Sequence, residues 1–139
     1  MDPKEKELNA KPEEKLIVAP APKPRISYDD FAKIELKAGK ILTVEPVLKS
    51  EKLLKLSVDF AETGMDGIRI PRTILSGIAK YFADPQTLVG KKVMFVTNLE
   101  PRALMGMESN GMILALSTDD GKFSLLEPNA DIPEGTKAK

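Results

Sequence analysis

The chain has 139 residues, of which 42% are hydrophobic and 30% charged, and its 21 basic and 21 acidic residues give a formal net charge of zero. This composition predicts a single domain with one core, accompanied by a tail. The chain contains no cysteine and no histidine, which excludes disulfides, thiolate or imidazole metal sites and histidine-dependent catalysis, and favours a cytoplasmic location.

The first 25 residues are rich in lysine, glutamate and proline and contain one apolar cluster, at 16–18. Such a segment buries too little apolar surface to offset the entropy lost on ordering. We therefore expect residues 1–25 to be a disordered tail or linker and residues 26–139 to form the folded domain. The start of the chain lacks the apolar region of a signal peptide, and no apolar run reaches the roughly 18 residues of a membrane span. This predicts a chain without a membrane segment or an export signal.

The domain is predicted to begin with a short helix. Ser27 to Asp30 resembles a capping box, which favours a helix over 31–36 that ends at Gly39. Residues 40–44 are then rich in β-forming side chains, and residues 54–60 alternate strictly between apolar and polar. Alternation of this kind is typical of a half-buried strand.

The remainder of the domain also has a strand pattern. A turn at 64–67 precedes a predicted strand at 68–75, a short helix at 76–83 and a long strand at 88–99. Two final strands, at 112–116 and 123–126, are joined by a hairpin turn at 118–121, and residues 129–139 form an irregular C-terminal arm. The fold class is therefore all-β with short helices. A five-stranded barrel of OB type fits this order, and a β-sandwich is the alternative.

Three segments are candidates for binding. The first is the polar segment 98–112, which lies between two apolar runs and which we interpret as a binding loop on a rigid scaffold. The second is the basic stretch 49–55, whose lysines could equally well solvate a strand. The third is the pair Tyr81 and Phe82, which could stack on bases, although their spacing from Ile78 favours core packing.

Five strings of residues, which occur in order along the chain, carry a family resemblance. They lie at 26–36, 50–56, 75–82, 88–93 and 98–112. Together they resemble the OB-fold tRNA-binding domain found at the C-terminus of many bacterial methionyl-tRNA synthetases and as free-standing tRNA-binding proteins. The resemblance implies a homodimer that recognises the shape of folded tRNA, with no catalytic activity and no cofactor. A methionyl-tRNA synthetase catalytic chain is a further possible partner.

The resemblance also implies which residues contact tRNA. Lys52 matches the position in the Ser-Glu-Lys loop, Ser109 and Met112 match the Glu-Ser-Asn-Gly-Met motif, and Asn98 and Arg102 match the preceding Asn-Leu-x-Pro-Arg element. Lys52 and Arg102 would contact phosphates, Asn98 and Ser109 would bond to sugars or base edges, and Met112 would contact an exposed base.

Two positions in the polar segment depart from the family pattern. Glu100 stands where the family usually has lysine, and Ala103 stands near a position that is often basic. Fewer phosphate contacts predict modest affinity and a shallow salt dependence. The loss of positive charge keeps two alternatives open: a peptide-binding export chaperone of the same fold, and a dimerisation domain with weakened RNA binding.

Overall fold

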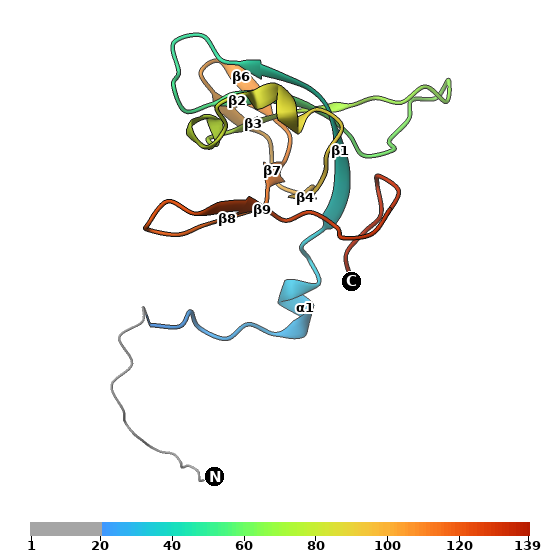
Figure 1. Ribbon diagram of the computed structural model, residues 1–139. Helices are drawn as coiled ribbons and strands as arrows, with labels where there is room; N and C mark the ends of the chain where they lie inside the picture. Colours follow the sequence, from blue (N-terminus) through green and yellow to red (C-terminus); the bar gives the residue numbers. More distant parts are fainter. Residues whose placement is uncertain (1–20) are drawn as a thin grey trace.

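The computed structural model describes residues 21–139, and its centre is a five-stranded antiparallel sheet (Figure 1). The strands lie in the order β3-β2-β1-β4-β7. Their bounds are Leu36–Pro46 for β1, Leu54–Asp59 for β2, Arg72–Ser76 for β3, Lys92–Val96 for β4 and Met112–Ile113 for β7. The sheet curls until its two edges approach, and the backbone N–H of Asn110 donates to the carbonyl of Thr73 at 2.9 Å. The expected all-β fold with a five-stranded, nearly closed barrel of OB type is confirmed.

Strand β1 starts earlier than predicted because Gly39 lies inside it. A Cβ atom at this glycine would lie 2.5 Å from Cε1 of Phe60, which leaves room only for a residue without a side chain. The predicted helix over 31–36 is wrong. Helix α1 covers only Tyr28–Phe31, and the Ser27 hydroxyl accepts a hydrogen bond from the backbone N–H of Asp30 at 3.0 Å.

Other predicted elements are shorter than expected. The strand at 68–75 begins only with β3, and the helix at 76–83 is a single 3-10 turn, η1, at Ala79–Tyr81. The strand at 88–99 is wrong at its start, where the 3-10 turn η2 at Pro85–Leu88 precedes β4. The run 112–116 divides into β7 and β8 (Ala115–Ser117), because β8 leaves the barrel sheet to pair with β9 (Phe123–Leu125). The hairpin predicted at 118–121 does join β8 to β9.

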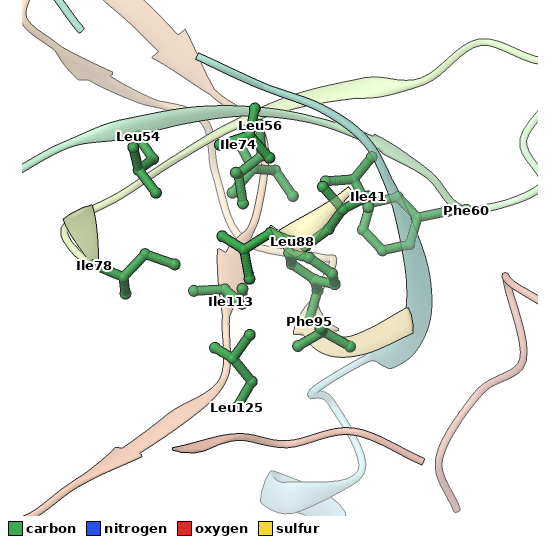
Figure 2. Close-up of a cluster of buried hydrophobic side chains, with 13 residues drawn as sticks. Ile41, Leu54, Leu56, Phe60, Ile74, Ile78, Leu88, Phe95, Ile113 and Leu125 are labelled. Carbon is green, nitrogen blue, oxygen red and sulfur yellow. The ribbon is translucent and has the colours of Figure 1, made fainter. Parts of the chain in front are cut away.

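The barrel interior is filled by aliphatic side chains around two phenylalanines. Phe60 and Phe95 pack edge to face with ring centroids 5.2 Å apart. Figure 2 shows the side chains that surround them, including Ile41, Leu56 and Leu88. Their burial supplies the main driving force for the fold. The same packing positions β3 and β4, the two strands next to the candidate site.

Tyr81 and Phe82 pack against this core rather than facing solvent as a stacking platform. The Tyr81 ring stacks on Phe123 with centroids 4.1 Å apart, and Phe82 meets the same ring edge to face at 5.6 Å. The core interpretation of this pair is therefore the one that the structure supports.

The C-terminal arm lies along the first residues of β1. The backbone N–H of Ala38 donates to the Thr136 carbonyl, and the N–H of Ala138 donates to the Leu36 carbonyl, each at 2.9 Å. The arm therefore extends the sheet beside β1. Most of the predicted tail at 1–25 lies outside the described residues. Among the helices at 21–139, none is long and apolar enough to cross a membrane.

Candidate nucleic-acid interface

The polar segment 98–112 contains a β-hairpin rather than an irregular loop. Strands β5 (Arg102–Leu104) and β6 (Met107–Ser109) pair in antiparallel register, with Arg102 opposite Ser109. Met105 and Gly106 make the turn, and both have positive φ, at 51° and 78°. Left-handed backbone at two successive residues is typical of the tight turns that fit twisted hairpins. The segment is thus an ordered surface element.

Ser109 joins this hairpin to strand β3. Only 5% of the residue is exposed, and its hydroxyl oxygen accepts a hydrogen bond from the backbone N–H of Leu75 at 2.9 Å. The same hydroxyl lies 3.3 Å from the Gly111 carbonyl, to which it donates. A buried N–H that lost this partner would be costly. The hydroxyl predicted to contact RNA is therefore engaged inside the protein.

Arg72 bonds to the backbone before and after the hairpin. Its Nη1 donates to the carbonyl of Thr97 at 2.6 Å and to that of Asn110 at 3.2 Å. Its Nε and Nη2 donate to the two carboxylate oxygens of Glu62 at 2.8 and 2.6 Å. The hydrogen bonds from Arg72 hold the pKa of Glu62 below its ordinary value, against a smaller effect of burial. Arg72 is not among the residues predicted from the sequence, and its only signal there is a single charge at the start of an otherwise uncharged strand.

Asn98 bonds to the chain that precedes β1. Its Oδ1 accepts from the backbone N–H of Glu35 at 2.8 Å, and its Nδ2 donates to the Lys33 carbonyl at 2.6 Å. The neighbouring Thr97 hydroxyl donates to the Glu35 carboxylate at 2.6 Å and is the main reason why the pKa of Glu35 is lowered. The Asn98 amide thus ties the segment to the chain between α1 and β1.

Arg102, Met112 and Lys52 are exposed. Lys52 lies in a turn ordered by Ser50, whose hydroxyl accepts from the N–H of Leu53 at 3.1 Å. Leu54, which follows this turn, pairs with Ser76 at the end of β3, next to the residue that Ser109 contacts. The Lys52 turn and the hairpin therefore lie at the same end of the barrel, where Figure 1 shows the loop after β1 close to β6.

A small cavity of about 70 Å³ lies at the base of the hairpin. It brings together Arg102, Ser109 and Met112 of the five predicted site residues, whereas Lys52 and Asn98 do not line it. Its remaining walls are Leu75, Leu99, Glu100, Leu104 and Gly111. The arrangement offers apolar contact beside one carboxylate and one guanidinium. Across residues 21–139, no group of three or more carboxylate, thiol or imidazole side chains could hold a metal ion.

Residues 36–137, which include the whole hairpin, match the family model described as "Putative tRNA binding domain". The chain belongs to this family. The tRNA-binding domain fold is shared with a MetRS-related protein from Pyrococcus horikoshii, where MetRS denotes methionyl-tRNA synthetase. That structure is 35% identical, with a TM-score of 0.73, and the match covers 84% of this chain and 100% of the other.

Two further relatives of this domain are named differently, one as a tRNA ligase and the other as a chaperone. A methionine–tRNA ligase of Myxococcus xanthus is 48% identical over 114 residues, which is 82% of this chain but only 15% of the ligase. The chain therefore spans a small part of such synthetases. The chaperone CsaA of Bacillus anthracis is 26% identical with a TM-score of 0.68, and the match covers 84% of this chain and all of CsaA.

Proposed function

We propose that this chain is a non-catalytic, cytoplasmic module that binds folded tRNA by its shape, either free-standing or associated with a methionyl-tRNA synthetase. The family match over 36–137 carries the proposal, because it includes the β5–β6 hairpin and the strands that hold it. The relatedness to methionine–tRNA ligases supports tRNA as the nucleic acid and a synthetase catalytic chain as a possible partner.

The hydrogen bonds of the hairpin support a division of roles among the five predicted residues. Lys52, Arg102 and Met112 are exposed and available for contact with phosphates and a base. Asn98 and Ser109 make their side-chain bonds within the protein, so we propose that they hold the hairpin in its binding conformation. This division differs from the direct sugar or base contacts that the resemblance implies for these two residues.

A comparison of three ligands tests the proposal. Binding of the full chain to folded tRNA, to a single-stranded RNA and to an unfolded polypeptide is measured at low and at physiological salt. We expect preference for folded tRNA, with affinity that falls as salt rises because phosphate contacts release counterions. Absence of any tRNA preference at low salt would defeat the proposal.

The second candidate function is a peptide-binding chaperone, which the likeness to CsaA and the zero net charge favour. Tight binding of the unfolded polypeptide without tRNA binding would select it. The third is a dimerisation domain with weakened RNA binding. Dimerisation in the absence of affinity for either ligand would select that alternative.

We also propose a homodimer that uses the surface around α1 and the C-terminal arm. An apolar groove of about 450 Å³ there is lined by Ala38, Met94 and Leu126 among others, and it shares Lys137 and Ala138 with a second groove beside Ile34. Ile34 is 45% exposed, although it is a large apolar residue. The first groove and the exposed Ile34 side chain supply apolar surface, which is typical of an interface, and the second groove is mainly polar.

Sedimentation velocity tests the dimer with a pair of matched variants. Ile34→Asp places a charge on the proposed interface and should yield monomers. Leu116→Asp, at another exposed apolar residue, on β8, should leave the dimer intact. A wild-type chain that sediments as a monomer at all concentrations would contradict this part of the proposal.

A further inference from the structure

The cavity at the base of the hairpin has apolar walls and an exposed rim that carries two opposite charges. Leu75, Leu99, Leu104 and Met112 supply the apolar side chains, of which Leu99 and Met112 are each 47% exposed. Because these exposed residues line it, the cavity is accessible from solvent. Its volume of about 70 Å³ is several times the 10–15 Å³ that one water needs.

Only two charged or polar side chains at this cavity have groups left for a ligand. The Ser109 hydroxyl is engaged with Leu75 and Gly111. Glu100 and Arg102 are both exposed, and both line the cavity. An ionised carboxylate only accepts hydrogen bonds and a guanidinium only donates them. A ligand that satisfies both must combine an apolar ring face with donors and acceptors on its edge.

We infer that this cavity receives one unstacked guanine base, with Glu100 reading its pairing edge. The inference rests on the proposed function and names the part of the RNA that this site takes. Unpaired RNA bases are commonly bound by apolar contact or stacking on their faces and by hydrogen bonds at their edges. The negative charge of Glu100 opposes contact with phosphates, but its carboxylate can accept hydrogen bonds from such a base.

The chemistry of the four bases selects guanine. Its pairing edge presents two adjacent donors, the N1–H and the N2 amino group, which match the two oxygens of the Glu100 carboxylate. Adenine and cytosine present an amino group beside an unprotonated ring nitrogen, and uracil presents one N–H between two carbonyls, so each places an acceptor against the carboxylate. Among base edges, guanine O6 and N7 are the acceptors that arginine contacts most often, so in this cavity Arg102 binds the base rather than a phosphate.

Other faces of the hairpin do not offer this combination. Glu108 is exposed and lies on β6, but it pairs across the hairpin with Ala103 and does not line the cavity. It therefore serves as a matched control, because Glu100→Gln and Glu108→Gln remove the same charge from the same hairpin. Any difference in guanine preference between the two variants would therefore come from the cavity and not from the change in net charge.

The test uses four RNA hairpins that share one stem and differ only in a single unpaired loop nucleotide. We expect the guanine hairpin to bind about 5- to 150-fold more tightly than the uracil hairpin, the range of a good bidentate contact. Glu100→Gln should remove this preference, since a glutamine amide has one oxygen and cannot accept from both donors without a clash. Glu108→Gln should retain it. The methyl NMR signal of Met112 should shift with the guanine hairpin.

Three results would overturn the inference. They are equal binding of all four hairpins, equal effects of the two glutamine variants, and a Met112 methyl signal that moves with an apolar peptide but not with the guanine hairpin. In each case folded tRNA is measured in parallel. Retained tRNA binding would then show that only the guanine cavity has failed, whereas loss of all RNA binding would reject the proposed function.

Discussion

The hydroxyl of Ser109 and the backbone N–H of Leu75, 34 positions apart in the chain, form a buried hydrogen bond of 2.9 Å. This bond fixes β6 to β3 and closes the floor of the cavity between them. Ser109 therefore influences any ligand of the hairpin through the position of its neighbours. Because this hydrogen bond is buried, a substitution that removes the Ser109 hydroxyl should first lower the stability of the domain.

Ser109→Ala should lower the free energy of unfolding by about 1–3 kcal/mol, because it leaves the buried N–H of Leu75 without its acceptor. Urea unfolding measures this loss directly. Affinity for tRNA should fall as well, since the hairpin loses an attachment. An alanine variant of unchanged stability that nevertheless lost tRNA affinity would instead indicate direct contact between Ser109 and RNA.

Arg72→Lys should loosen the hairpin while keeping the positive charge. A lysine ammonium cannot bond to both oxygens of Glu62 and also reach the carbonyls of Thr97 and Asn110. Hydrogen exchange of the amides in β5 and β6 should become faster. Affinity for tRNA should fall with an unchanged salt slope, because the guanidinium of Arg72 bonds within the protein and is not among the groups proposed to contact phosphate.

Arg69→Lys is the control for this prediction. Arg69 bonds to Asp59 at 2.7 Å and to Glu134 at 3.1 Å, and it contacts neither end of the polar segment. The control variant should leave exchange in the hairpin unchanged. If both variants altered tRNA binding equally, the effect would come from general loss of ion pairs and not from the attachment of the hairpin.

Lys52→Ala should reduce the salt dependence of tRNA binding. Removal of one phosphate contact lowers the slope of log K against log salt by about 0.7–0.9, and the exposed side chain makes no contribution to the core. Lys122→Ala, in the turn between β8 and β9, is the matched loss of one exposed lysine. Equal slopes for the two variants would mean that Lys52 acts only through net charge.

The strands could be predicted where side-chain alternation reports a half-buried sheet, as in β2, which the predicted run 54–60 matches within one residue. Gly39 shows where such reasoning fails. A glycine shortly after a predicted helix is typical of a helix end, but here Gly39 lies within a strand and packs against the Phe60 ring. The conformation at Gly39 is determined by its close approach to a residue that is distant in sequence, and local sequence patterns do not report such contacts.

The candidate site could be predicted in outline by its motif, which places Arg102 and Met112 in one polar segment, but the β-hairpin within that segment was not predicted. The inward direction of Ser109 could not be predicted, because a hydroxyl suits a buried amide and an RNA sugar equally well. Asn98 is exposed, but the bonds of its amide to Lys33 and Glu35 could not be predicted either, because an amide suits backbone groups and RNA equally well. Arg72 was missed because its partners Thr97 and Asn110 offer only backbone carbonyls, which every sequence contains.

Acid should destabilise the domain through the carboxylates around this site. The pKa of Glu62 is lowered from its ordinary value of 4.5, chiefly by the hydrogen bonds from Arg72, and the pKa of Glu35 is lowered chiefly by that from Thr97. A carboxyl group whose pKa is depressed by folding stabilises the native state above its unfolded pKa, and this contribution disappears as the pH falls through the folded value. The domain should therefore lose stability below about pH 4.5.

Glu62→Gln should weaken this acid dependence, because the glutamine amide keeps one hydrogen bond from Arg72 but does not titrate. Urea unfolding at about pH 7 and about pH 3.5 measures the change for each protein. The variant should be less stable than the wild type at neutral pH, and the difference should shrink in acid. Glu108→Gln, at an exposed carboxylate on β6, should follow the wild-type curve. If the free energy of unfolding fell equally with pH in Glu62→Gln and in the wild type, protonation of Glu62 would not contribute to the acid destabilisation.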